Sequence, residues 1–141
     1  MRRVIPANKV NHDYEKVLSE FVSALKNRLG EYLLMVYLTG SYARGDANDN
    51  SDLDVFCIFS TINQYVLENV GHCARNTSIP YDLLEINTQC LSVDEYKSKI
   101  FEDWSEYAIA ELNSVLLYGE QLVKIENINE KIQLSLSLIH I

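Results

Sequence analysis

Two aspartates separated by one residue, Asp52 and Asp54, precede an apolar run in the middle of this 141-residue chain. Side chains alternate between the two faces of a β-strand. Both carboxylates should therefore project on one face, while Leu53 and Val55 point into the core. Carboxylates held this close repel each other unless a positive charge lies between them. Paired carboxylate oxygens suit a hard divalent cation, and we expect magnesium.

A Gly-Ser step, Gly40-Ser41, stands before the acidic pair, at the end of an apolar run from Tyr32 to Leu38. Glycine lets the backbone turn sharply and come close to a ligand. A strand that passes here into a short helix, around Tyr42 to Arg44, leaves backbone N–H groups that suit a phosphate. A phosphate-binding turn beside metal-binding carboxylates is what metal-assisted transfer from a nucleoside triphosphate needs. The predicted chemistry is nucleotidyl transfer.

The order of these motifs resembles the signature of the polymerase-beta-like nucleotidyltransferases. Leu38-Thr39-Gly40-Ser41 matches its hydrophobic-Gly-Ser turn, and Asp52-Leu53-Asp54-Val55 matches its Asp-hydrophobic-Asp strand. The fuller pattern, G-S-x-A-R-G and then S-D-x-D, resembles the minimal nucleotidyltransferases and the aminoglycoside nucleotidyltransferases. The resemblance covers about residues 10–120. It implies an α/β fold of the α+β type, a small mixed β-sheet flanked by helices.

The same resemblance implies roles for individual residues. Asp52 and Asp54 would hold two Mg²⁺ ions, roughly 3.5–4 Å apart in sites of this kind. Arg44 would either offset the charge of a triphosphate or hold the loop through Asp46 or Asp49, and both interpretations stay open. Contacts to the nucleotide are implied for four residues: Gly40, Ser41, Arg44 and Ser51.

A third carboxylate on a neighbouring strand completes the metal site in this family and accepts the proton of the attacking hydroxyl. Asp82 resembles that residue, because it stands at the start of a predicted strand, Tyr81 to Ile86. Glu85 is the alternative. The two have opposite parity, so on a regular strand only one of them can face the site. We favour Asp82 as the third catalytic and metal-binding acid.

The implied reaction is the in-line attack of an acceptor hydroxyl on the α-phosphate of a nucleoside triphosphate, with release of pyrophosphate. ATP is the expected nucleotide, and the acceptor is a small molecule, such as an aminoglycoside, or a protein. A second interpretation is a minimal nucleotidyltransferase that acts as antitoxin with a separate helical HEPN-type toxin. A third is a nucleotide-binding module without catalysis. Small-molecule enzymes of this family usually carry a helical acceptor-binding domain after the catalytic one, which this chain would lack.

Composition argues against several other classes of protein. The net charge of -8 does not suit non-specific nucleic-acid binding, which needs a basic surface. No apolar run approaches the roughly 18 residues that span a bilayer, and the N-terminal residues do not resemble a signal peptide. Three widely spaced cysteines, Cys57, Cys73 and Cys90, suit a reducing compartment. We expect a cytoplasmic protein with neither a membrane nor a nucleic acid as partner.

Periodicity predicts the elements that must position these residues. An amphipathic helix over Asn11–Leu29 should cover one face of the sheet, and Ser92 and Glu95 form a capping box that opens a later helix. The other predicted elements are strands over Tyr32–Leu38, Leu53–Phe59 and Tyr81–Ile86, a helix over Ile62–Asn76 capped by Ser60 or Thr61, and a helix over Tyr107–Tyr118.

Residues 1–125 are predicted to form the catalytic domain, and residues 126–141 a C-terminal extension. The last six residues read L-S-L-I-H-I. One possible set of codons for them resembles the end of a transposon-based sequencing adapter. Our hypothesis is that Leu136 to Ile141 are not native and that the gene continues. The alternative is a genuine amphipathic helix over Ile125–Ile141.

Overall fold

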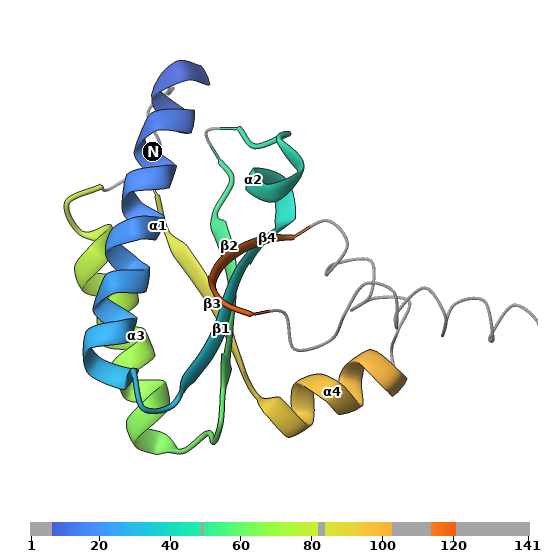
Figure 1. Cartoon of the computed structure of the whole chain (residues 1–141). Helices are drawn as coiled ribbons and strands as arrows, with labels where there is room; N and C mark the ends of the chain where they lie inside the picture. The colour runs from blue at the N-terminus through green and yellow to red at the C-terminus, as the bar shows by residue number, and fades with distance from the viewer. Residues whose placement is uncertain (1–6, 49, 82–83, 103–113, 121–141) are drawn as a thin grey trace, which may run out of the picture.

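The computed structural model describes residues 7–48, 50–81, 84–102 and 114–120 (Figure 1). These residues form a four-stranded sheet with the strand order β3-β2-β1-β4. Strand β1 is antiparallel to both of its neighbours, whereas β2 and β3 are parallel. The predicted extension over 126–141 lies outside the described residues. The strands are β1 (Leu33–Thr39), β2 (Leu53–Phe59), β3 (Ile86–Ser92) and β4 (Val115–Gly119).

Helices lie on both sides of this sheet. Two of them, α1 (Ala7–Leu29) and α3 (Gln64–Ser78), pack side by side on one face, and α4 (Val93–Glu102) lies on the other (Figure 1). The short α2 (Gly40–Arg44) continues directly from the end of β1. None of the helices in the described ranges has both the length and the hydropathy of a bilayer-spanning segment.

The two central strands are buried on both faces, as their nearly continuous apolar sequences predict. On the face covered by α1 and α3, Leu53, Val55 and Phe59 of β2 are at most 1% exposed and belong to one core cluster with the inner side chains of both helices. On the opposite face Tyr37 stacks on Phe56, with ring centroids 5.1 Å apart. The ring of Tyr37 also lies 6.3 Å from that of Tyr96 in α4, which connects this helix to the sheet.

One edge of the sheet gathers the residues of chemical interest. Because β1 and β2 are antiparallel, the end of β1 meets the beginning of β2, and Thr39 pairs with Asp54. Because β2 and β3 are parallel, the beginning of β3 lies at the same edge, and Asp54 pairs with Asn87. The register therefore places Thr39, Asp54 and Asn87 in one row across three strands.

The third predicted strand was placed too early. The chain turns after α3, with the N–H of Leu84 donating to the carbonyl of Tyr81 at 2.8 Å, and β3 begins only at Ile86. The predicted segment ends where the real strand begins. The prediction relied on the apolar residues before Ile86, but pairing with β2 selects the segment from Ile86 onward. There the exposure of the side chains alternates, as on a strand with two different faces.

The helix predicted over Tyr107–Tyr118 is wrong for its described part. Residues Val115–Gly119 form strand β4, which pairs with the free edge of β1. Residues 107–113 lie outside the described residues. A short apolar run such as V-L-L-Y fits helix and strand equally well by periodicity, so the open edge of β1 decides its conformation.

Helix α3 begins two residues later than predicted, and its cap is Asn63 rather than Ser60 or Thr61. The side-chain oxygen of Asn63 accepts a hydrogen bond from the N–H of Val66 at 2.9 Å. Asparagine is as good a cap as serine, so propensity alone does not choose between them. Starting at this position, the helix turns Val66 into the core, where it is fully buried.

The predicted capping box at the start of α4 is confirmed. The N–H of Glu95 donates to Oγ of Ser92 at 3.2 Å, and the N–H of Ser92 donates to Oε1 of Glu95 at 3.3 Å. Each side chain thus satisfies a backbone donor that has no partner inside the helix.

Replacing Ser92 by alanine should lower the free energy of unfolding by about 0.5–2 kcal/mol, because the N–H of Glu95 loses its acceptor. Urea unfolding followed by circular dichroism measures this change. Ser98→Ala is the matched control, since Ser98 is exposed on the same helix. Equal stability of the two variants would contradict a stabilising role for the box.

Candidate active site

Asp54, the second residue of β2, is held from both neighbouring strands. Its backbone carbonyl accepts a hydrogen bond from the hydroxyl of Thr39 in β1 at 3.4 Å. Its carboxylate oxygen Oδ1 accepts one from the side-chain amide of Asn87 in β3 at 3.2 Å. The other carboxylate oxygen, Oδ2, lies against Gly40. Both the backbone and the carboxylate of Asp54 are therefore placed by residues distant in the sequence.

The approach of Gly40 to Asp54 leaves no room for a side chain on the glycine. A Cβ atom built on Gly40 would collide with Oδ2 of Asp54 and would lie 3.2 Å from its Cγ. Gly40 also has a φ of 73°, in the left-handed region that glycine adopts most readily. The structure thus brings the Gly-Ser turn and the second aspartate together, as the motif spacing predicts.

Asp52 directly precedes β2 and shares its parity with Asp54, so both aspartates belong to the face opposite α1 and α3. Leu53 between them is fully buried in the core. No group of three or more His, Cys, Asp or Glu among the described residues could hold a metal ion. The two aspartates still fit Mg²⁺, which proteins usually bind through one or two carboxylates while water and substrate phosphates complete the shell.

The third carboxylate stays a prediction. Asp82 lies outside the described residues. The backbone N–H of Leu53 donates to the carbonyl of Glu85 at 2.9 Å, which is part of the first parallel pair of the ladder, Leu53 with Ile86. Glu85 stands two positions before Asn87, so pleating places it on the face of Asp54. The register therefore supports Glu85 as a candidate, while the preference for Asp82 stays a prediction.

Helix α2 begins at Gly40, two residues earlier than the predicted short helix. Its N-cap residue, Thr39, makes no side-chain capping bond, since its hydroxyl donates to the carbonyl of Asp54 instead. At the other end the carbonyl of Ser41 accepts hydrogen bonds from the N–H groups of Gly45 and Asp46, at 2.9 and 3.0 Å.

Tyr42 anchors α2 to the rest of the domain. Its side chain is buried, and its ring lies 5.0 Å from the ring of Tyr14 in α1. Two aromatic side chains in contact add stabilisation to the area that they bury. Sequence reasoning assigned Tyr42 no role beyond the short helix, because the contact joins residues far apart in the chain.

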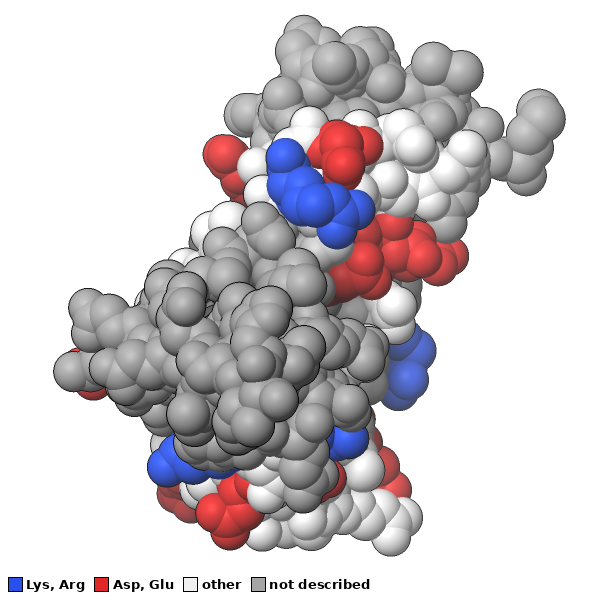
Figure 2. Space-filling view, turned by 90° about the vertical axis from the view of Figure 1, so that its right-hand side faces the viewer, with Lys and Arg blue, Asp and Glu red and all other residues white. Residues whose placement is uncertain are grey.

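Two predicted nucleotide-binding side chains hold the loop after α2. Nε of Arg44 lies 3.4 Å from Oδ2 of Asp46, and Oγ of Ser51 accepts a hydrogen bond from the N–H of Asn48 at 3.0 Å. Figure 2 shows acidic side chains beside basic ones in the upper part of the face that lies to the right in Figure 1. The side chains of the Arg44–Asp46 pair are 52% and 63% exposed, so this pair contributes little to stability.

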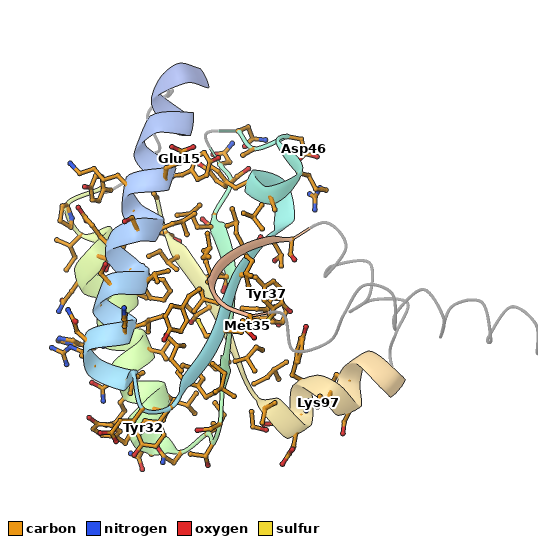
Figure 3. All side chains as sticks on the ribbon, viewed as in Figure 1. Glu15, Tyr32, Met35, Tyr37, Asp46 and Lys97 are labelled. Atoms are coloured by element: carbon orange, nitrogen blue, oxygen red, sulfur yellow. The ribbon has the colours of Figure 1, made fainter. Side chains whose placement is uncertain are left out.

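A groove of about 660 Å³ lies on the other side of α2, between α1, α2 and β4. Tyr14, Val22, Arg44 and Leu117 are among its lining residues, together with Glu15. Figure 3 shows Glu15 and Asp46 at the same end of the molecule. Neither aspartate of the acidic pair lines this groove. It shares α2 with the candidate active site but opens on the opposite face of the sheet.

Three cysteines on the side of the sheet covered by α1 and α3 have shifted pKa values. Cys57 and Cys90 are register partners on β2 and β3. A hydrogen bond to Cys90, together with burial, raises the pKa of the Cys57 thiol, and the same hydrogen bond lowers the pKa of Cys90. Burial raises the pKa of Cys73. Cys57 and Cys90 have opposite parity to Asp54 and Asn87 on their strands, and Cys73 lies in α3, so all three thiols lie outside the candidate active site.

Comparison with known proteins identifies the family. Residues 18–134 match the family model described as a nucleotidyltransferase domain. The chain belongs to this nucleotidyltransferase family. The matched span includes the Gly40-Ser41 turn and both aspartates, so the family resemblance predicted from these motifs is confirmed.

One relative by sequence is a protein of Methanocaldococcus jannaschii named "Putative protein adenylyltransferase MJ0604". It is 39% identical over 54 residues, which cover 38% of this chain and 54% of that protein. The match thus spans about half the length of this relative.

Two similar solved structures are of a toxin–antitoxin with AMP-PNP and of spectinomycin adenyltransferase AAD(9) from Enterococcus faecialis with ATP and spectinomycin. The first is 17% identical and has a TM-score of 0.54, and the alignment covers 86% of this chain and 88% of that chain. The second is 15% identical and has a TM-score of 0.53, and the alignment covers 86% of this chain and 65% of that chain. At these identities the likeness concerns the fold, and it confirms the predicted mixed sheet flanked by helices.

Gly40→Ala should destabilise the domain more than Gly45→Ala, which makes the second substitution a matched control. Both glycines have a positive φ, 73° and 84°, so both variants bear a left-handed strain of about 1–2 kcal/mol. An added Cβ meets Asp54 at position 40 and nothing within 4 Å at position 45. Urea unfolding should show an extra loss of about 1–3 kcal/mol for Gly40→Ala. Equal losses would contradict the close approach.

Proposed function

We propose that this chain is the catalytic domain of a metal-dependent nucleotidyltransferase that transfers AMP from ATP to a hydroxyl group of a small molecule or a protein. The observation that carries the proposal is the contact between the Asp54 carboxylate and the Gly40 turn in a member of this family. Asp52 on the same face supplies the second carboxylate. The free Cys57, Cys73 and Cys90 suit a cytoplasmic location.

In the proposed reaction the acceptor oxygen bonds to the α-phosphorus, and the bond from that phosphorus to the bridging oxygen breaks, which releases pyrophosphate. Asp52 and Asp54 would hold Mg²⁺, which supplies Lewis-acid stabilisation of the charge that develops on the phosphates. The third carboxylate, Asp82 or Glu85, would help to hold the metal and accept the proton of the attacking hydroxyl.

The turn after β1 would bind the β- and γ-phosphates through the backbone of Gly40 and Ser41. The hydroxyl of Thr39 does not cap α2, which supports a role for the first N–H groups of this turn in binding a ligand. Arg44 and Ser51 would also contact the nucleotide. The exposed Arg44–Asp46 pair can open at little cost in free energy, so the guanidinium can turn to a triphosphate.

The names of the similar proteins support an adenylyl group as the group that is transferred. They are compatible with a small molecule and with a protein as its acceptor. One relative is named a protein adenylyltransferase, and one solved structure contains ATP and the small molecule spectinomycin. The acidic surface of this chain, with a net charge of -8, argues against a polynucleotide as acceptor.

An antitoxin role is the second candidate function. It is supported by the similarity of the fold to a toxin–antitoxin structure that contains AMP-PNP. In this interpretation the acceptor hydroxyl belongs to a helical HEPN-type toxin encoded beside this chain. A non-catalytic nucleotide-binding module is less well supported, because the chain carries both the Gly40-Ser41 turn and the acidic pair Asp52 and Asp54.

Asp54→Asn should abolish Mg²⁺-dependent transfer of label from [α-³²P]ATP, because the variant keeps the shape of the side chain and removes its charge. Candidate acceptors are a panel of aminoglycosides, spectinomycin and the proteins encoded by adjacent genes. Chromatography detects a labelled small molecule, and a denaturing gel detects a labelled protein.

Asp46→Asn is the matched control, since it makes the same change of charge on the exposed loop after α2. It should keep most of the transfer activity. Unchanged transfer by the Asp54→Asn variant would refute the proposed function. Label on a small molecule would favour a small-molecule acceptor, and label on a helical protein encoded beside this chain would favour the antitoxin role.

A further inference from the structure

We propose that Asn87 is a positioning residue that orients the carboxylate of Asp54, an inference that rests on the proposed function. Asn87 is the register partner of Asp54 across the parallel pair of β2 and β3. Its side-chain amide donates to Oδ1 of Asp54 at 3.2 Å. The described residues thus include one side chain, that of Asn87, that donates a hydrogen bond to the carboxylate of Asp54.

An aspartate carboxylate needs such a partner to have one orientation. The terminal torsion of aspartate is broad and roughly two-fold, so the carboxylate plane is weakly defined by the backbone alone. The amide of Asn87 holds Oδ1 on the side of β3. Oδ2 is thereby directed at the Gly40 turn, where the missing Cβ leaves space for it. The two oxygens of one carboxylate therefore have different surroundings.

Stability of the fold does not explain the bond. Asn87 is exposed, and a hydrogen bond of this kind has a net worth of only about 0.5–1.5 kcal/mol. Metal-binding carboxylates, in contrast, depend on outer partners that fix their orientation, and removal of such a partner typically lowers metal affinity or activity by about 10–100-fold. The amide also brings a donor rather than a third negative charge to Asp54, which avoids carboxylate repulsion at this place.

The test compares Asn87→Ala, Asn87→Leu and the control Gln89→Ala with the wild-type chain. Leucine has nearly the shape of asparagine but no donor. Gln89 is exposed on the same strand and has the same parity as Asn87, so its substitution measures the general effect of a change on this face. Urea unfolding of all variants establishes that each of them is folded.

Binding of Mn²⁺, followed by the loss of the electron paramagnetic resonance signal of the free ion, is a readout independent of turnover. It is measured with and without AMP-PNP. Both Asn87 variants should bind Mn²⁺ about 10–100-fold more weakly than the wild type. Transfer of label from ATP should show a similar fall in kcat, with a KM for ATP within about two-fold. Gln89→Ala should resemble the wild type in both assays.

Mn²⁺ affinity and kcat within two-fold of the wild type in both Asn87 variants would overturn the inference. An equal loss in Gln89→Ala would also overturn it, because the effect would then belong to the strand and not to the amide. The proposed function fails separately, if Asp54→Asn keeps wild-type transfer activity. A result in which Asp54→Asn is inactive and the Asn87 variants are fully active rejects only the positioning role.

Discussion

The contact between the backbone at Gly40 and the carboxylate of Asp54 is the constraint on which the rest of the site depends. It arises because antiparallel β1 and β2 bring the end of one strand to the beginning of the other. A side chain at position 40 would occupy the place of Oδ2. The Gly40-Ser41 turn, which we propose binds phosphate, and the acidic strand can be adjacent only because that position lacks a Cβ atom.

This contact requires the side chains of β2 to alternate between the core under α1 and α3 and the opposite face of the sheet. One set of side chains, including Leu53 and Val55, is buried under α1 and α3, and burial of such side chains stabilises the fold by about 1.5–3 kcal/mol each. A slip of one residue would move these side chains to the opposite face and turn Asp54 toward the core. The hydrophobic core therefore sets the direction in which the two carboxylates point.

The opposite face is divided along its length. Tyr37, Phe56 and Tyr96 pack together near α4, whereas Thr39, Asp54 and Asn87 form a polar row at the edge beside α2. A buried aromatic cluster thus adjoins the part of the face proposed to bind metal and nucleotide. Residues that hold a site in one geometry are best supported by packed strands of this kind, since loops position side chains less precisely.

Local patterns were sufficient for the features that depend on neighbours in the chain. The acidic strand, the Gly-Ser turn, the helix now described as α1 and the capping box at Ser92 and Glu95 follow from spacing and periodicity, and the motifs also led to the correct family. Where a segment could pair in more than one way, the same patterns misplaced β3 and assigned the residues of β4 to a helix. Those segments are ambiguous by themselves, and the open edges of β2 and β1 select their conformation. The proposed role of Asn87 could not be predicted from the sequence for the same reason. Its hydrogen bond to Asp54 joins residues 33 positions apart and forms only when the two strands lie in register.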